Sequence, residues 1–250
     1  MTIIDAHTHM PGTAFTGIAG LEARSFLNEM DSHHIDQAWV FTLDGLFFDP
    51  APHNDLLKAF CDADPERLIS FCTVHPRYPN AVEELRRCIQ ELGMRGVKLH
   101  PWAQSFSPTD PIMMDPIGEE MAGLGVPVVF HDGTPPNSSP LQIAHFALRH
   151  PTVPVILGHG GLHDLWKEAV YAAERCPNIS IIPSGTPPYG LQHAVKRLPI
   201  ERFLFGSDAG FGDPYWQAFQ LEKIRSLNLS AADEALVLGG NAQRILGHNS

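Results

Sequence analysis

The chain has 250 residues, 44% hydrophobic and 18% charged, which is enough to form the core of a single barrel-sized domain. The formal net charge is −11 and no run of Lys or Arg occurs, which argues against nucleic acids and anionic membranes as partners. No apolar run approaches the roughly 20 residues that span a bilayer, and the N-terminus does not resemble a signal peptide. The four cysteines form no CxxC pair, as is typical of thiols in a reducing compartment. The sequence therefore predicts a soluble, cytoplasmic protein.

Short runs of Val, Ile, Leu and Phe alternate along the chain with longer segments of helical period. Most of these runs are continuously apolar, which is typical of strands that are buried on both faces. The expected strands cover residues 2–6, 37–42, 67–74, 96–99, 126–130, 153–157, 179–182 and 202–205.

Apolar residues recur at three- and four-residue steps between residues 80 and 93, which indicates an amphipathic helix. Similar stripes cover residues 140–148 and 164–175. The last helix is expected to begin after Ser230, whose hydroxyl can cap it, and to break at Gly239-Gly240.

Eight expected strands that alternate with helices predict an α/β fold, a single (β/α)₈ barrel of the TIM type over residues 1–250. An open, doubly wound parallel sheet is the alternative architecture. No linker or change of composition suggests a second domain.

Histidines gather where the expected strands end. In a parallel barrel the carboxyl ends of all strands face one side, where active sites form, so these side chains are expected to converge. His75 precedes a proline, and a structural role is expected for it. Six of the 14 histidines belong to this set, namely His7, His9, His75, His100, His131 and His159.

Four side chains at strand ends form a candidate metal shell. His7 and His9 flank one residue, so in an extended chain their imidazoles lie on the same side. His131 ends the fifth expected strand, and Asp208 follows the eighth, where a carboxylate is unfavourable to bury unless it is paired or binds a cation. Three imidazoles and one carboxylate suit Zn²⁺ with room for a water molecule. Hydrogen-bonded rim histidines are the simpler alternative, and Asp5 is either an outer partner or an ordinary strand residue.

Three further side chains point to the same end. His159 stands between glycines, which permit close approach of the backbone to a ligand, although a histidine in a tight turn is the simpler interpretation. Lys98 and His100 occupy alternate positions at the end of the fourth strand and should point the same way. Lys98 is a surface lysine, a substrate-binding cation or, if carboxylated, a bridge between two metal ions.

The ordered set of motifs resembles the amidohydrolase superfamily, specifically the amidohydrolase-related group that includes aminocarboxymuconate semialdehyde decarboxylase. The resemblance runs from residue 5 to residue 246. The matching segments are Asp5-Ala6-His7-Thr8-His9, Lys98-Leu99-His100-Pro101, His131, Gly158-His159-Gly160-Gly161, Gly206-Ser207-Asp208 and the closing helix from Gly239 to Leu246.

This resemblance implies a barrel with one divalent ion, Zn²⁺ before Mn²⁺, held by His7, His9, His131 and Asp208. It also implies that His159 is an acid/base residue beside the metal-bound water. Members of the group hydrolyse amide, lactone or related bonds, or decarboxylate unsaturated acids. This chain is shorter than many relatives, and Ala209-Gly210 replaces the usual aromatic residue and proline after the aspartate, which leaves the substrate open.

The leading hypothesis is a metal-dependent hydrolase of a small-molecule amide, lactone or related carbonyl substrate, in which Asp208 or His159 accepts the proton of an activated water. In this hypothesis Lys98 and His100 hold a polar group of the substrate. The alternatives are a metal-dependent decarboxylase of an unsaturated or aromatic acid and a barrel that binds a ligand without turnover. A dinuclear hydrolase with carboxylated Lys98 ranks lower. Barrels of this kind often self-associate, so a homo-oligomer is compatible with the sequence.

Overall fold

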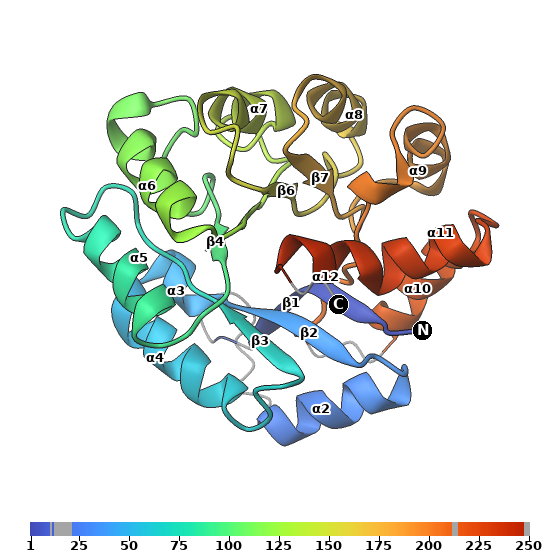
Figure 1. Cartoon of the computed structure of the whole chain (residues 1–250), viewed down its shortest axis with the longest axis horizontal. Helices are drawn as coiled ribbons and strands as arrows, with labels where there is room; N and C mark the ends of the chain where they lie inside the picture. The colour runs from blue at the N-terminus through green and yellow to red at the C-terminus, as the bar shows by residue number, and fades with distance from the viewer. Residues whose placement is uncertain (11, 13–21, 212–214, 248–250) are drawn as a thin grey trace.

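The computed structural model describes residues 1–10, 12, 22–211 and 215–247, and these form a parallel β/α barrel (Figure 1). The strands are β1 Ile4–Met10, β2 Gln37–Thr42, β3 Leu68–Phe71, β4 Val97–Leu99, β5 Val128–Phe130, β6 Val155–Leu157 and β7 Ile179–Ile181. The α-helices are α2 Ala23–Ser32, α3 Asp44–Phe47, α4 Pro50–Cys61, α5 Ala81–Gln90, α6 Pro111–Leu124, α7 Pro140–Arg149, α8 Trp166–Arg175, α9 Pro188–Ala194, α10 Trp216–Arg225, α11 Ala231–Ala235 and α12 Asn241–Ile245. A 3₁₀ turn, η1, covers Ile200–Arg202, and a π-helical turn, η2, covers Leu236–Gly240.

The strands form two parallel ladders, β1-β2-β3 and β4-β5-β6-β7, which isolated bridges join into one barrel. Between β3 and β4, the amide of Lys98 donates to the carbonyl of Cys72 at 2.7 Å. On the other side, Leu204 N donates to Ile181 O at 3.0 Å, and Ala6 N donates to Phe205 O at 2.9 Å. The segment around residues 203–209 therefore lies between β7 and β1 and takes the place of an eighth strand. The expected (β/α)₈ barrel is confirmed.

Most strand ends differ from the prediction by a few residues, and the differences in the first and eighth strands bear on the site. The eighth strand, expected over residues 202–205, is not a regular strand, because η1 ends at Arg202 and Phe205 N turns to the carbonyl of Val237. The first strand, expected to end at Ala6, continues to Met10, so His7 and His9 lie inside β1. Polar histidines in a strand interior break the apolar run that the prediction relied on.

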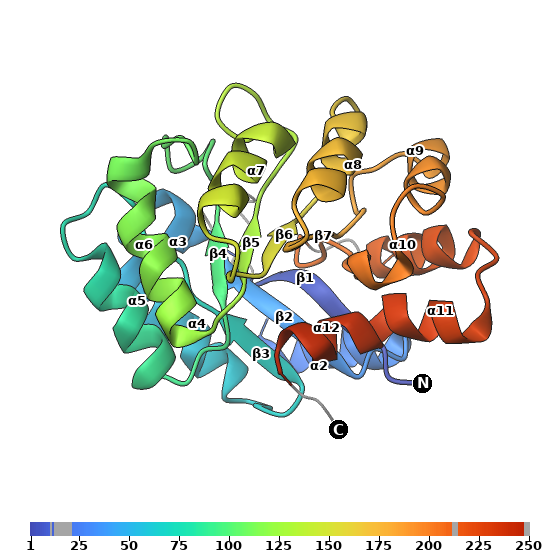
Figure 2. The same cartoon turned by 45° about the horizontal axis from the view of Figure 1, so that its top comes forward.

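The helices surround the sheet on its outer side, from α2–α5 through α6–α9 to α10–α12 (Figures 1 and 2). The expected helices appear as α5, α7 and α8, and the Ser230 hydroxyl accepts from Asp233 N at 3.1 Å as the cap of α11. The last helix does not break at Gly239-Gly240, since η2 joins α11 to α12. A Cβ on Gly239 would lie 2.2 Å from the carbonyl oxygen of Thr2, so a glycine permits this turn to pack against β1.

The core has two layers. A large cluster fills the space between the sheet and the helices, and a smaller one fills the barrel interior. In β2, Trp39 and Phe41 point inward while Ala38 and Val40 point outward, as the two-residue period of a strand requires. The inner cluster fills the barrel below its carboxyl end. No helix in the described part of the chain is both long and apolar enough to cross a membrane.

Candidate active site

A β-bulge in β1 turns His7 and His9 toward the mouth of the barrel. Asp5 pairs with Ala38 and Thr8 pairs with Val40, so a step of three residues along β1 matches a step of two residues along β2. Ala6 points into the barrel, and without the extra residue the next inward position would be Thr8. Instead, Thr8 donates its hydroxyl to Trp39 O at 2.8 Å, and the histidines on either side of it face the interior.

Asp5 joins this strand to the segment that carries Asp208. Its carboxylate accepts from the Ser207 amide at 2.8 Å, from the Ser207 hydroxyl at 2.5 Å and from Gln217 Nε2 at 3.3 Å. Burial raises the pKa of Asp5 to about 6, although hydrogen bonds from Ser207 oppose the shift. Asp208, which follows Ser207, has a φ of 67°. This backbone conformation is unfavourable for residues other than glycine and is typical of functional sites. Asp5 is thus an outer partner of the site.

His7, His9 and Asp208 bring three candidate ligand atoms within 4.8 Å of one another. Asp208 Oδ1 lies 3.0 Å from His9 Nε2 and 3.4 Å from His7 Nε2. Both histidines are buried, and the Asp208 side chain is 26% exposed toward the cavity. His9 Nδ1 is buried with no hydrogen-bond partner among the described residues. Two imidazole nitrogens and one carboxylate oxygen suit Zn²⁺ or Mn²⁺.

The hydrogen bonds of His7 fit it for metal binding. Its Nδ1 lies 2.9 Å from Gly158 O, which can only accept, so Nδ1 carries the proton and Nε2 has the lone pair, to which Lys98 Nζ lies 3.0 Å away. Such a contact to a backbone carbonyl orients most metal-binding histidines. Burial lowers the pKa of His7 well below its usual value, and the charge of Lys98 adds to the effect. His7 is therefore neutral, and its Nε2 faces the candidate ligand atoms of His9 and Asp208.

His131 lies beside this three-residue group and not within it. Its Nε2 is 2.7 Å from Thr134 Oγ1, and its ring stacks on His100 with centroids 3.7 Å apart and planes at 14°. Burial is the main cause that lowers the pKa of both histidines. Metal binding by His131 stays a prediction, since His131 is not part of the group of three residues whose ligand atoms lie close together.

His159 lies next to the metal-ligand candidates, and its backbone contacts the buried carboxylate of Asp132. Its ring centroid is 4.8 Å from that of His7, and its Nδ1 is 3.0 Å from Ser184 Oγ and 3.9 Å from Asp208 Oδ2. Burial lowers the pKa of His159 to about 4, against the opposing charge of Asp208. The backbone is held by Asp132, whose carboxylate accepts from His159 N at 2.6 Å.

Lys98 is the cation of the site. Its side chain is almost fully buried, with Nζ 3.0 Å from His7 Nε2 and 4.9 Å from the centre of the Phe41 ring. Burial lowers the pKa of Lys98 to about 7, although the charges of Asp208 and Asp132 oppose the shift. A lysine that is readily switched between its two forms can bind an anionic group or release a proton.

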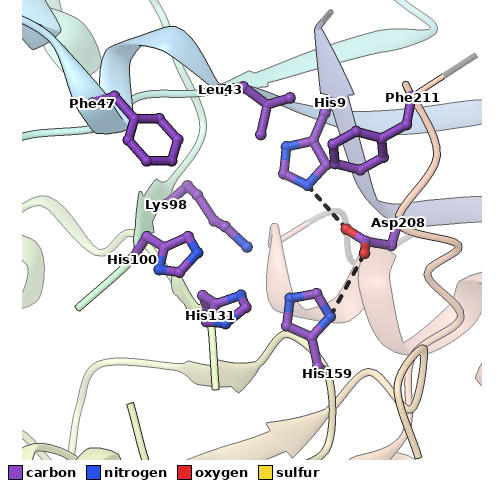
Figure 3. Close-up of a pocket in the computed structure, with 9 residues that line it drawn as sticks. All are labelled: His9, Leu43, Phe47, Lys98, His100, His131, His159, Asp208 and Phe211. Atoms are coloured by element: carbon purple, nitrogen blue, oxygen red, sulfur yellow. Dashed lines mark hydrogen bonds and ion pairs between the residues drawn. The ribbon is translucent and has the colours of Figure 1, made fainter. Parts of the chain in front are cut away.

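A cavity of about 130 Å³ lies over these groups (Figure 3). The apolar side chains of Leu43, Phe47 and Phe211 lie along the upper edge of the view together with His9, and Lys98, His100, His131 and His159 lie below them (Figure 3). Among the described residues that line the cavity, Asp208 is the sole acid. The lining consists of His9, Leu43, Phe47, Lys98, His100, His131, His159, Asp208 and Phe211.

The structure therefore gathers all seven predicted site residues at the carboxyl end of the barrel, with His7 just below the cavity. His75 lies elsewhere, stacked on Tyr78 with centroids 4.7 Å apart. Sequence reasoning missed the apolar wall, Asp132 and Ser184. Asp132 directly follows His131, so its position at a strand end was a usable signal, whereas no local pattern marked Ser184.

The sequence profile of the family described as Amidohydrolase matches residues 4–248, nearly the whole chain. The chain belongs to the amidohydrolase family. This match confirms the resemblance inferred from the motifs and shows an enzyme of the amidohydrolase superfamily.

Relatives and solved structures add detail. The gamma-resorcylate decarboxylase of Rhizobium sp. strain MTP-10005 is 31% identical over 106 residues, which cover 40% of this chain and 32% of that protein. The match thus spans about a third of the length of that curated relative. The solved structure of 2,6-dihydroxybenzoate decarboxylase from Rhizobium has a TM-score of 0.75 at 19% identity and covers 100% of both chains. A dihydroxybenzoic acid decarboxylase from Polaromonas sp. JS666, with bound manganese and the inhibitor 2-nitroresorcinol, has a TM-score of 0.73 at 19% identity and covers 100% of this chain and 98% of that one. At these identities the structural matches show the fold alone.

Proposed function

We propose that this protein is a metal-dependent, non-oxidative decarboxylase of a hydroxylated aromatic acid with a single ring. The observation that carries the proposal is the two-sided cavity, in which Leu43, Phe47 and Phe211 lie along one edge and Lys98 lies below them with most of the histidines (Figure 3). An apolar wall fits the face of an aromatic ring, and the opposite side offers a cation and imidazoles to its carboxylate and hydroxyl groups. The partial match to gamma-resorcylate decarboxylases supports the same substrate class.

The size of the cavity is compatible with one aromatic ring. Its volume is about 130 Å³, and an apolar cavity of roughly 150 Å³ is known to accept benzene. The polar groups of a substrate extend toward the metal-ligand candidates and the mouth. A larger, multi-ring acid would have to displace Phe47 or Phe211 from the wall.

His7, His9 and Asp208 are the residues that would hold the metal, with His131 beside them as a further candidate ligand. A bound divalent ion supplies a Lewis acid that polarises substrate oxygens and fixes their position. We favour Zn²⁺ for the imidazole-rich donor set, with Mn²⁺ as the alternative.

The reaction needs one proton at one carbon. The ring carbon that bears the carboxylate gains a hydrogen, its bond to the carboxyl carbon breaks, and the electron pair of that bond returns to the ring. One carboxylate and one proton are consumed, and one CO₂ and one arene are released. His159, whose Nε2 faces the cavity, is the group that takes up a proton from water on Nε2 and delivers it to this carbon, and buried Lys98 orients the substrate (Figure 3).

Hydrolysis of an amide or lactone, the leading hypothesis from the sequence, ranks second. It is favoured by the pairing of His159 with Asp208, since Nδ1 and Oδ2 lie 3.9 Å apart next to the metal-ligand candidates, an arrangement that also suits activation of water. It ranks lower because the curated relatives that match are decarboxylases and because the apolar wall fits a ring better than a flexible amide.

The test is a product assay on Zn²⁺- or Mn²⁺-loaded protein with 2,6-dihydroxybenzoate, related hydroxybenzoates, lactones and amides. We expect CO₂ and the corresponding phenol in equal amounts, with one deuterium at the former carboxyl-bearing carbon in D₂O. The His159→Asn variant should lose turnover by about 10²- to 10⁴-fold. His163→Asn is the matched control, because the His163 side chain is 73% exposed, and it should keep full activity. Acid or alcohol products from the lactones without CO₂ from any benzoate would contradict the proposal.

A further inference from the structure

The loop after β7 supplies a serine to His159. Ser184 is 7% exposed, and its Oγ lies 3.0 Å from His159 Nδ1 and 3.1 Å from the carbonyl oxygen of Gly158. The same carbonyl lies 2.9 Å from His7 Nδ1. One backbone oxygen therefore connects a metal-ligand candidate to the acid/base candidate through a single hydroxyl group.

One order of donors and acceptors satisfies every contact in this series of hydrogen bonds. A carbonyl oxygen can only accept, so the one hydrogen of the Ser184 hydroxyl points to Gly158 O. The lone pairs of Oγ are left for His159, which must donate its Nδ1–H to them. Asp208 Oδ2, at 3.9 Å from the same nitrogen, also favours a hydrogen there. The Nε2 lone pair of neutral His159 then faces the cavity.

Two buried side chains of α10 hold Ser184 in place. Lys223 Nζ donates to the carbonyls of Pro183 at 2.7 Å and Ser184 at 2.8 Å, and Gln220 Nε2 donates to Ser184 O at 3.0 Å. Lys223 and Gln220 are 7% and 1% exposed. Thr186 donates from the same loop to Gly160 O at 3.0 Å, next to His159. The loop is thus fastened on both sides of the serine, which limits where its hydroxyl can lie.

We propose that Ser184 is a positioning residue that sets the tautomer of His159, with the proton on Nδ1 and the working lone pair on Nε2. This inference rests on the proposed function only for the role of His159 in turnover. The tautomer itself is a property of the folded chain that can be measured without any substrate. Outer partners of this kind commonly change activity by about 10- to 100-fold when they are removed.

The experiment compares Ser184→Ala and Ser184→Thr with Ser180→Ala. Ser180 lies on β7 and is also 7% exposed, so it is a matched buried serine. Two-bond ¹H–¹⁵N spectra of histidine-labelled protein report the tautomer of His159, whose signal is identified by its loss in His159→Asn. We expect the Nδ1–H form in wild type, Ser184→Thr and Ser180→Ala, and a mixture of both forms in Ser184→Ala.

In the decarboxylase assay, Ser184→Ala should lower kcat by about 10- to 100-fold with KM changed by less than about threefold. Ser184→Thr, which keeps the hydroxyl, should restore most of the rate. If Ser184→Ala does not fold, Ser184→Cys makes the same comparison with a near-isosteric and weaker acceptor. An unchanged tautomer in the folded Ala or Cys variant overturns the inference, whatever the activity. If no acid is decarboxylated by wild type, the proposed function fails while the spectra still decide the role of Ser184.

Discussion

Two buried polar networks in this barrel differ in what they leave unpaired. Between α4, β3 and α5, both oxygens of Glu84 are occupied, because Asn54 donates at 2.8 Å and Arg87 donates at 2.8 and 2.9 Å. Asn54 also exchanges two hydrogen bonds of 2.9 Å with the backbone of Thr73. At the barrel mouth, in contrast, His9 Nδ1 has no hydrogen-bond partner among the described residues. Lys98 Nζ contacts His7 Nε2, a nitrogen that is also a candidate metal ligand.

The difference separates stabilising polar groups from functional ones. A network whose donors and acceptors are matched rigidifies the fold, whereas a buried network with unmatched groups is unfavourable unless a ligand completes it. The mouth gathers one lysine and several imidazoles around a single cavity-facing acid, Asp208, and this residue also has an unfavourable φ. Substitutions at the barrel mouth should therefore reduce activity more than stability, and substitutions in the network around Glu84 should reduce stability more than activity.

The largest expected effect is that of Asp208→Asn. Burial opposes ionisation of Asp208, but His159, the hydrogen bond from His9 and the nearby Lys98 together keep the pKa of Asp208 below its usual value, so wild type presents an ionised carboxylate to the cavity. The neutral amide should reduce bound metal from about one ion per chain to well below that value and turnover by at least about 10²-fold. Elemental analysis and the CO₂ assay on identically purified proteins measure both quantities.

The same variant should unfold in the metal-free state within a few degrees of wild type, because Asp208 serves the ligand more than the fold. Equal metal content in the variant and wild type would remove Asp208 from the metal shell. A decrease in melting temperature as large as that of a core substitution would contradict the contrast between the two networks.

A smaller effect on activity, together with a loss of stability, is expected for Gly158→Ala. The added Cβ would lie 2.8 Å from Phe130 O and 2.9 Å from His7 Cε1, so either the strand or the metal-ligand candidate must move. We expect a loss of about 1–3 kcal/mol in the free energy of unfolding. Turnover should fall by about 10- to 100-fold, since a displacement of about 1 Å is enough for the larger value.

Gly123→Ala provides the control for this substitution. Gly123 lies in the last turn of α6, and a Cβ there would have no neighbour within 4 Å among the described residues. The variant should be neutral or more stable by up to about 1 kcal/mol in denaturant unfolding, with normal turnover. If Gly158→Ala behaves like Gly123→Ala, close packing of the backbone against His7 is not a requirement of the site.

The sequence predicted the barrel and the side on which the site lies, because apolar strand runs and the residues that end them are local patterns. His100 and His131 follow their strands as expected, and both line the cavity. The bulge after Asp5 could not be predicted, because it depends on how β1 pairs with β2. The eighth strand was mispredicted for a similar reason, since Phe205 N bonds to Val237 and not to a neighbouring strand.

The finer details of the site depend on contacts between residues far apart in the chain. Ser184 reaches His159 from the next loop, and Asp5 reaches Ser207 across more than 200 residues. No spacing rule encodes such pairs. The apolar wall was missed because Phe47 belongs to a short helix, α3, whose position over the barrel mouth follows from tertiary packing.

The smallest expected effect on activity, and a clear one on stability, is that of Glu84→Gln. The Glu84 side chain is 9% exposed, and although burial opposes ionisation, hydrogen bonds from Arg87 and Asn54 outweigh it and lower the pKa of Glu84. A lowered carboxyl pKa stabilises the fold fully above the unfolded value of about 4.3, and this stabilisation is lost as pH falls through the folded value. At pH 7 the variant should lose about 1–3 kcal/mol, because Arg87 is left with a neutral partner.

That loss should shrink as the pH is lowered below about 4, where wild-type Glu84 is itself protonated. Denaturant unfolding at a series of pH values measures it, with the exposed neighbour Glu83→Gln as control. Metal content and turnover should stay at the wild-type level in both variants, because Glu84 does not line the cavity. A loss that is the same at pH 3 and pH 7 would assign the effect to packing, whereas a loss of metal would mean that the two networks are coupled through β3 and β4.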